Sequence, residues 1–131
     1  MRLLLDTNAF LWWMAGDTQL GARARDRIAT AANDVLLSSV VIWEIAIKRA
    51  IGRLDLEMPT SELVDGALTV QGFRPLAFDS DHAMRVEDLP PHHGDPFDRA
   101  LIAQALVTKA PILTADRILG RYDVAVLDAR N

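Results

Sequence analysis

The sequence contains no cysteine, a single tyrosine and no hydrophobic run long enough to span a membrane. Without cysteine the chain forms neither disulfides nor thiolate metal sites, so any metal must be held by oxygen or imidazole groups. The apolar run Leu3 to Leu5 ends at Asp6, too early for a signal peptide. We therefore expect a cytoplasmic protein that is neither exported nor bound to a membrane.

Positive charge is also scarce, because acidic residues outnumber basic ones and the net charge is −4. Phosphate binding depends mainly on clustered Lys and Arg, so this charge argues against a protein that coats nucleic acid, although the basic residues could still gather on one surface. Half of the residues are hydrophobic, enough for a chain of this length to bury a core. No repeat or linker-like stretch interrupts the sequence, so we expect one domain over residues 1–131.

Short apolar runs alternate along the chain with stretches of helical spacing. The apolar runs predict strands at residues 3–5, 35–37, 74–78, 112–114 and 124–127. Helical spacing and capping residues predict helices at about residues 9–15, 23–32, 40–48, 59–70, 79–86 and 95–109. Strands that alternate with helices predict an α/β sandwich around a mainly parallel sheet of four to five strands.

Acidic residues fall where the predicted strands end. Asp6 directly follows the first strand, and Asp116 follows the strand at 112–114 after one alanine. Glu44 lies early in the helix after the second strand, and Asp98 lies in the first turn of the helix before the fourth. In an open α/β sheet ligands bind beyond the carboxyl ends of the strands. We therefore expect Asp6, Glu44, Asp98 and Asp116 to form the catalytic site.

Four converging carboxylates repel one another, and at least one would take up a proton unless a cation were present. A divalent cation resolves this conflict. Oxygen ligands without cysteine favour Mg²⁺ or Mn²⁺ over Zn²⁺. Such ions bind phosphate oxygens and lower the pKa of a bound water, which is the chemistry of phosphodiester hydrolysis.

The ordered set of motifs resembles a known family. The segments that carry this resemblance are Asp6-Thr7-Asn8 after an apolar strand, Ser38-Ser39 followed by Glu44, Asp95-Pro96-Phe97-Asp98-Arg99-Ala100-Leu101-Ile102-Ala103-Gln104-Ala105, and Thr114-Ala115-Asp116. Together they are similar to PIN-domain ribonucleases and, more narrowly, to the VapC-type toxins of bacterial toxin–antitoxin pairs. The resemblance covers nearly the whole chain, and its specificity comes from the order of the motifs rather than from any one of them.

The resemblance implies a three-layer α/β/α fold and a Mg²⁺- or Mn²⁺-dependent endoribonuclease that leaves 3′-hydroxyl and 5′-phosphate ends. It also implies a VapB-type antitoxin and a homodimer. By position, Asp6 and Asp98 would bind the metal directly, with Glu44 and Asp116 helping directly or through water. Supporting roles would fall to three further residues: Thr7 or Asn8 would orient Asp6, and Thr114 would support the site from the strand end.

Each acid also has a structural alternative. Asp6 and Asp116 could cap the segments that follow them, and Asp98 could simply be an acid favoured by a helix N-terminus. Glu44 has Lys48 four residues later, the favourable order for a helical ion pair, but its apolar neighbours make burial of a lone carboxylate costly. Asp95, directly before Pro96, is better explained as a helix cap than as a ligand.

Other polar and aromatic residues receive simpler assignments. His92 and His93 are adjacent in a proline-rich loop and lack the spacing of a zinc motif, so we do not expect them to bind the metal. Arg99 and Arg117 each follow one of the acids, and we expect them to contact the RNA backbone. The three tryptophans lie in apolar segments and are expected in the core or an interface rather than stacked on bases, namely Trp12, Trp13 and Trp43.

Several other functions compete with the toxin. A receiver domain would place paired acids after the first strand and a haloacid-dehalogenase-like phosphatase would place a second Asp at position 8, but Asn8 is neutral. A PIN-like interaction module with little turnover is disfavoured because all four acids are present. A PIN nuclease of RNA maturation or DNA flap cleavage stays open, and a neighbouring antitoxin gene would decide between it and the toxin.

Overall fold

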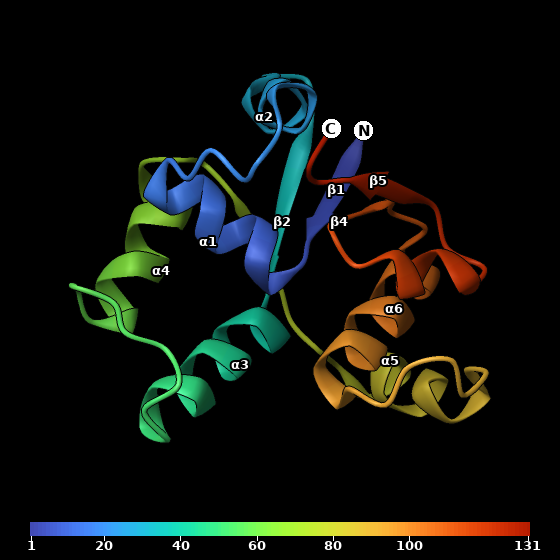
Figure 1. Cartoon of the computed structure of the whole chain (residues 1–131). Coiled ribbons are helices and arrows are strands. Elements are labelled where there is room, and N and C mark those ends of the chain that lie inside the picture. The colour runs from blue at the N-terminus through green and yellow to red at the C-terminus, as the bar shows by residue number, and fades with distance from the viewer.

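In the computed structural model, which describes residues 1–131, five strands form one sheet in the order β3-β2-β1-β4-β5 (Figure 1). Every neighbouring pair is parallel. The strands are β1 (Arg2–Leu5), β2 (Asp34–Ser38), β3 (Arg74–Leu76), β4 (Ile112–Thr114) and β5 (Val126–Asp128). The predicted α/β fold with a mainly parallel sheet is therefore confirmed, with all five strands in one sheet.

Helices cover both faces of this sheet, with α1 and α4 on one side and α5 and α6 on the other (Figure 1). The α-helices are α1 (Thr7–Ala15), α2 (Ala22–Ala29), α3 (Ser39–Ala50), α4 (Thr60–Thr69), α5 (Ser80–Arg85) and α6 (Pro96–Thr108). Two 3₁₀ turns, η1 (Val86–Asp88) and η2 (Arg117–Arg121), complete the chain. The apolar stretch of every helix falls short of what crossing a membrane requires.

The central strands are buried on both faces, which explains why they are continuously apolar. Leu3, Leu4 and Leu5 of β1 have no exposed surface, and neither do Ile112 and Leu113 of β4. The same burial makes their carboxyl ends rigid, because several layers of packed side chains fix the strand positions. Polar residues that directly follow these strands are therefore held in defined places.

Both edge strands differ from the sequence expectation, and α2 ends at Ala29 rather than residue 32. β3 ends at Leu76 rather than residue 78, and β5 covers 126–128 rather than 124–127. β3 contains Pro75, which lacks a backbone N–H and is tolerated at the edge of a sheet. Edge strands bury fewer side chains, so their ends are marked less clearly by hydrophobicity than those of the central strands.

Helix α1 begins at Thr7, two residues earlier than expected, because Asp6 caps it. The Asp6 carboxylate accepts a hydrogen bond from the Ala9 N–H, which satisfies one free donor of the first turn. The helix ends as expected at Gly16, whose φ of 65° lies in the left-handed region that glycine adopts easily. Strand β1 thus passes into α1 through a single capping aspartate.

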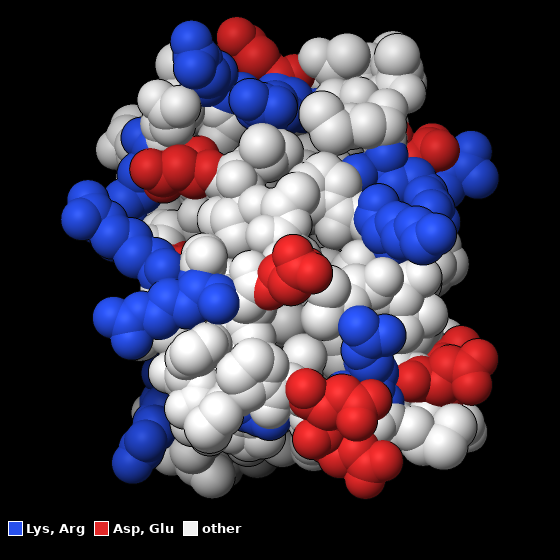
Figure 2. Space-filling model, turned by 90° about the vertical axis from the view of Figure 1, so that its right-hand side faces the viewer, with Lys and Arg blue, Asp and Glu red and all other residues white.

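Charged side chains of both signs are scattered over the face that contains α5 and α6 (Figure 2). In the view of Figure 2, basic and acidic groups are interspersed around an uncharged area. Several basic groups follow one another along the left-hand margin of this view, and acidic groups lie among the basic ones elsewhere on this face.

Candidate active site

The four predicted acids meet at the carboxyl edge of the sheet. Asp6 directly follows β1, and its N–H still donates to Leu113 O of β4 at 3.2 Å. Asp116 follows β4 after one residue, Glu44 lies in α3 and Asp98 lies in the first turn of α6. The charges of Glu44 and Asp116 act on Asp6, and those of Asp6 and Glu44 act on Asp98. Residues from four distant parts of the chain thus form one electrostatically coupled group.

Asp6 is almost fully buried, with 6% of its surface exposed. Its Oδ1 accepts the N–H of Ala9 at 2.8 Å and its Oδ2 accepts the hydroxyl of Thr114 at 2.6 Å. Burial raises the pKa of Asp6 to about 6, against the lowering effect of these two hydrogen bonds. Asp6 therefore caps α1, as the structural alternative predicted, and is at the same time a member of the acid group.

Glu44 is equally buried and has a protein partner for each oxygen. Thr7 Oγ1 donates to its Oε1 at 2.6 Å, and Lys48 Nζ lies 2.5 Å from its Oε2. The expected ion pair within α3 is therefore present, and donation to Glu44 raises the pKa of Lys48. Glu44 is a carboxylate whose charge is already compensated on one side.

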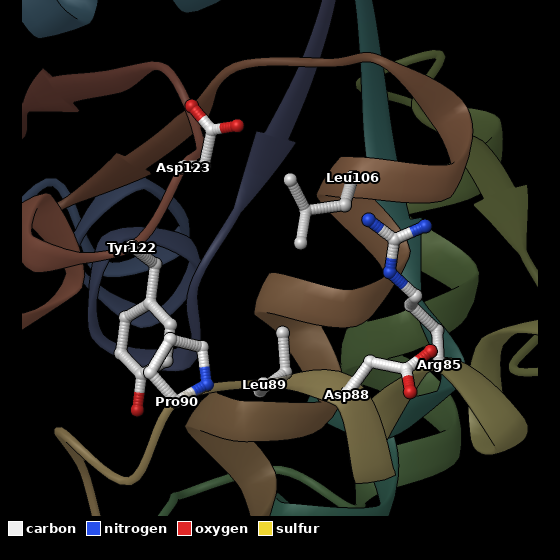
Figure 3. A pocket seen from close by; sticks show the side chains of 7 residues that line it. All are labelled: Arg85, Asp88, Leu89, Pro90, Leu106, Tyr122 and Asp123. Carbon is white, nitrogen blue, oxygen red and sulfur yellow. The ribbon is translucent and has the colours of Figure 1, made fainter.

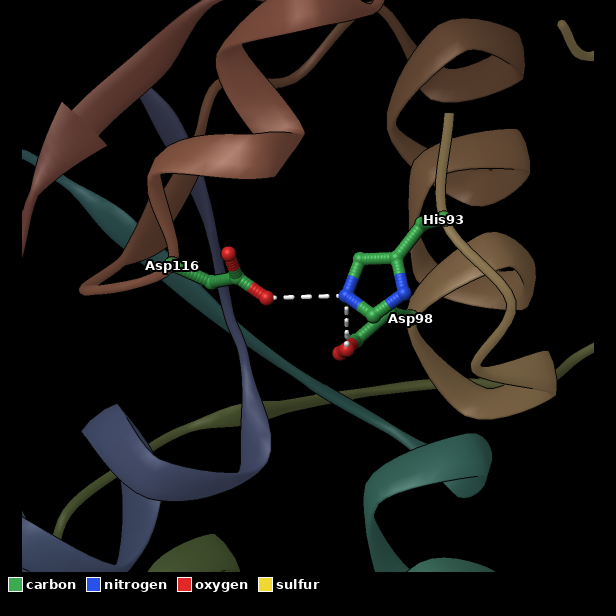
Figure 4. A group of neighbouring side chains, drawn as sticks. All are labelled: His93, Asp98 and Asp116. Carbon is green, nitrogen blue, oxygen red and sulfur yellow. Dashed lines mark hydrogen bonds and ion pairs between the residues drawn. The ribbon is translucent and has the colours of Figure 1, made fainter. Parts of the chain in front are cut away.

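Asp98 and Asp116 are less enclosed and share a different partner, His93 (Figure 4). The Nε2 atom of His93 lies 2.8 Å from Asp116 Oδ2 and 3.0 Å from Asp98 Oδ2. Burial, with the charge of nearby Asp95 as the next cause, raises the pKa of Asp98 to about 7. Asp116 also caps η2, because its Oδ1 accepts the N–H of Ile118 at 2.9 Å.

One ligating atom from each of His93, Asp98 and Asp116 lies within 4.8 Å of the other two. Asp6 and Glu44 are not part of this tight group. His93 was not expected at the metal site, because its spacing from His92 suggested no ligand motif. The sequence signal that would have helped is its place five residues before Asp98, in the loop that leads into α6.

Asp95 is the N-cap of α6. Its Oδ1 accepts the N–H groups of Phe97 and Asp98 at 2.8 and 3.2 Å, while Pro96 occupies the first helical position. This cap sets the start of the helix and therefore the place of Asp98 in the first turn. Its negative charge also disfavours ionisation of Asp98.

The supporting residues differ partly from expectation. The Thr7 hydroxyl donates to Glu44 rather than Asp6, and Asn8 is exposed. Thr114 links two acids, because its hydroxyl donates to Asp6 and accepts the N–H of Asp116 at 3.0 Å. The strand end is thus tied to the acid group by a single threonine.

Arg99 binds within the chain rather than projecting outward. Its guanidinium donates to Pro90 O at 2.9 Å, to the carbonyl groups of Val86 and Leu89, and to Tyr122 Oη at 3.3 Å. Arg117, in contrast, is exposed. The expected RNA contact remains a prediction for both residues, but only Arg117 has a side chain free for it.

The tryptophans are less buried than their apolar neighbours suggested. Trp43 has 53% of its surface exposed and contacts Phe97 edge-to-face, with ring centroids 4.8 Å apart. Trp12 and Trp13 are partly buried against the core. Trp43 is therefore not a core residue. Of the two places expected for it, the core and an interface, only the interface is left.

A small pocket of about 240 Å³ lies between η1, α6 and the segment after β4 (Figure 3). Leu106 and Leu89 point toward its centre, Tyr122 forms one side, and Arg85 and Asp88 lie at its rim (Figure 3). None of the four acids lines it. The acid group therefore lies outside this pocket.

The residues present fit a hard divalent cation. The acid group offers carboxylate oxygens and one imidazole, with no thiolate. Burial, together with the charges of neighbouring carboxylates, raises the pKa values of two of its carboxyl groups, Asp6 and Asp98. A divalent cation would supply that compensation.

Comparisons with solved structures identify the same fold in toxin–antitoxin complexes. VapBC2 from Rickettsia felis bound to a promoter DNA fragment has a TM-score of 0.73 at 13% identity, with 97% of this chain and 98% of that chain covered. VapBC-1 from nontypeable Haemophilus influenzae has a TM-score of 0.65 at 15% identity, with both chains fully covered. A toxin–antitoxin complex from Klebsiella pneumoniae has a TM-score of 0.60 at 14% identity, with 97% of each chain covered. The TM-scores establish a shared fold, and at identities this low they establish the fold alone.

Sequence comparison gives the family. Among functionally curated proteins no sequence matches significantly. The profile of the PIN domain family matches residues 3–125, which include all four acids of the site. The match confirms the resemblance inferred from the ordered motifs, and the chain belongs to the PIN domain family.

Proposed function

We propose that the chain is a divalent-metal-dependent endoribonuclease that acts as the toxin of a VapBC-type toxin–antitoxin pair. One observation carries this proposal: the carboxyl edge of a PIN fold holds buried Asp6 and partly buried Asp98 with pKa values raised to about 6 and about 7. Such groups ionise at neutral pH when a cation joins them. Perturbed carboxyl groups of this kind are typical of functional sites.

The chain's residues divide the work in this proposal. Asp6 and Asp98 hold Mg²⁺ or Mn²⁺, with Glu44 and Asp116 contributing directly or through water. When bound, the cation binds phosphate oxygens and lowers the pKa of a water for attack on the phosphodiester. Thr114 fixes the carboxylate of Asp6 in advance, so that its orientation is set before the substrate arrives. The expected products have 3′-hydroxyl and 5′-phosphate ends.

The biological context comes from the structural neighbours, which were solved as VapBC and other toxin–antitoxin complexes. We extend this to the present chain as a proposal: a VapB-type antitoxin binds it and suppresses cleavage, and the active toxin is a homodimer. Co-expression with the product of the neighbouring gene tests this. Growth arrest that the neighbour relieves supports the toxin, whereas a nuclease without growth arrest would favour RNA processing outside a toxin–antitoxin pair.

Cleavage of RNA by purified protein tests the activity. We expect Mn²⁺ or Mg²⁺ to support cleavage by the wild type, and EDTA, Asp6→Asn and Asp98→Asn each to abolish it. Asp26→Asn is the matched control, because Asp26 is an exposed acid on α2, away from the carboxyl edge of the sheet (Figure 1). Mapping of 5′ ends in cells that express wild type or Asp6→Asn identifies the substrate.

Two results would contradict this function. Cleavage that persists in folded Asp6→Asn or Asp98→Asn would remove the acid group from the chemistry. RNA binding by the wild type without any metal-dependent cleavage would instead identify a PIN-like interaction module.

A further inference from the structure

The His93 side chain lies between two of the acids. A single ring nitrogen, Nε2, contacts both Asp116 Oδ2 and Asp98 Oδ2, at 2.8 and 3.0 Å (Figure 4). Only 15% of the side chain is exposed. The imidazole is therefore enclosed at the acid group rather than directed into solvent.

The other ring nitrogen fixes which atom carries hydrogen. His93 Nδ1 accepts the backbone N–H of Asp95 at 3.1 Å. A backbone N–H can only donate, so Nδ1 presents its lone pair and Nε2 bears the hydrogen. Nε2–H therefore donates its hydrogen bond to Asp116 Oδ2, while Asp98 Oδ2 lies 3.0 Å from the same nitrogen.

The loop that carries His93 is also held in place. The His93 N–H donates to Tyr122 Oη at 2.8 Å, and the same hydroxyl accepts from Arg99 at 3.3 Å. Arg99 further binds Pro90 O at 2.9 Å. Because Arg99 directly follows Asp98 in α6, the loop is clamped to the helix that presents one of the acids.

We propose that His93 is a positioning residue of the metal site: its Nε2–H binds Asp116 and lies against Asp98, and this holds the two carboxylates side by side. Each carboxylate oxygen can accept more than one partner, so the hydrogen bond leaves lone pairs for a cation. This role rests on the proposed function, because it concerns the same site. It assigns His93 to hydrogen bonding outside the ligand set rather than to direct coordination.

Direct coordination by Nε2 conflicts with the contact at Nδ1. A neutral imidazole that binds a metal through Nε2 carries its hydrogen on Nδ1. That hydrogen would face the Asp95 N–H, and two donors would meet where a hydrogen bond now exists. The Asp95 amide therefore favours the donor role of His93 over the ligand role.

Titration of the metal-free protein with Mn²⁺ alone tests this role. We expect His93→Ala to weaken Mn²⁺ binding about 10- to 100-fold, the usual effect of losing a hydrogen-bonding partner of metal ligands. His93→Gln keeps an N–H donor at a similar position and should stay within about threefold of wild type. His92→Ala is the matched control, because His92 is exposed and packs against the Tyr122 ring instead of the acids.

Pulsed electron paramagnetic resonance of the Mn²⁺ complex gives an independent readout. We expect no coupling from a directly bound nitrogen in the wild type. A nitrogen coupling that disappears in His93→Gln would overturn the proposal and make His93 a ligand. Unchanged or tighter Mn²⁺ binding by His93→Ala would also overturn it, as would an equal loss in His93→Gln and His93→Ala.

The outcome is separable from that of the proposed function. The titration needs no RNA. If the wild type binds Mn²⁺ but cleaves no RNA, the proposed nuclease activity is contradicted, and the Mn²⁺ affinities of the variants still decide the role of His93. A wild type that takes up no Mn²⁺ would overturn both proposals.

Discussion

The two halves of the acid group are built differently. Asp6 and Glu44 are almost fully buried, and every carboxylate oxygen has a hydrogen-bond donor from the chain. Asp98 and Asp116 keep 21% and 35% of their side chains exposed and share His93. The first half is part of the framework, whereas the second half opens toward solvent.

This difference indicates where exchange with solvent and substrate occurs. Groups with fixed donors keep their geometry whether or not a cation is present, which favours preorganisation. Groups that are partly exposed can change partners at a lower energetic cost, because water can replace a lost partner. We therefore expect substitutions in the closed half to affect both stability and activity, and substitutions in the open half to affect mainly activity.

Asp98→Asn should give the largest effect. It removes a charge from the open half, and we expect cleavage to be abolished, a loss of at least about 10²- to 10³-fold, the scale of losing one charge-stabilising group in an active site. The metal-free protein should not lose stability at neutral pH, because an uncompensated, partly buried charge is removed with it. Cleavage rates and thermal unfolding of the same preparation check both expectations. A clear loss of thermal stability together with the loss of cleavage would contradict the distinction between the two halves.

Arg99→Ala should destabilise the protein by about 2 kcal/mol, because several hydrogen bonds to carbonyl groups and Tyr122 are lost. Arg117→Ala is the matched control at an exposed arginine and should leave stability nearly unchanged. Its expected effect is a decrease of about one in the salt dependence of RNA binding. Chemical denaturation and salt titrations of RNA binding separate the two arginines, and the reverse pattern would make Arg99 the RNA contact.

Thr114→Val should weaken the closed half. It removes the hydroxyl that donates to Asp6 and accepts from Asp116, at a cost of about 1 to 2 kcal/mol in the free energy of unfolding. The pKa of Asp6 should rise further, because one of the bonds that lower it is lost. Denaturation measurements and carboxyl titration by NMR check this, and an unchanged pKa would show that the bond does not hold the carboxylate.

The metal-free protein should lose stability as the pH rises. The pKa values of Asp6 and Asp98 in the folded protein, about 6 and about 7, exceed the value of 3.8 expected without burial. The folded state therefore binds more protons than the unfolded state between these values, and stability decreases as the pH rises through them. We expect a Tm decrease of roughly 5 °C between about pH 5 and about pH 8.

Mn²⁺ and the variant Asp98→Asn provide the controls for this pH effect. The cation should counteract the loss because it compensates the carboxylates, and the variant should reduce the pH dependence. A Tm that rises over the same interval in the wild type would contradict the raised pKa values.

Lys48→Ala should give the smallest effect. Its ion pair with Glu44 spans one helical turn and the lysine is 42% exposed, so we expect a change of about 0.5 kcal/mol or less in stability. Glu44 keeps its bond to Thr7 in this variant. Denaturation curves check the size, and a loss of several kcal/mol would mean that Lys48 is essential for burial of Glu44.

Hydrophobicity and capping chemistry made much of the fold predictable. The central strands β1, β2 and β4 are buried on both faces and stand out as apolar runs, and Asp95-Pro96 marks the start of α6. The ends of β3 and β5 were harder to predict from the sequence, because edge strands lack a continuous apolar run. Local signals therefore suffice where burial is complete and fail at the edges of the sheet.

The site was predictable to the extent that strand ends determine it. The four acids follow from their places after strands and at helix starts, whereas the arrangement of His93 depends on Tyr122, 29 residues away from it. The contacts of Arg99 with loop carbonyls are likewise tertiary. No spacing rule in the sequence encodes a loop that is positioned by such distant partners.

Calorimetric titration of the metal-free protein with Mn²⁺ tests most directly whether the acid group is a cation site. We predict binding by the wild type, a rise in Tm on addition of Mn²⁺, and loss of both in Asp98→Asn, while Asp26→Asn behaves as wild type. No heat of binding and no change in Tm for the wild type would contradict the account.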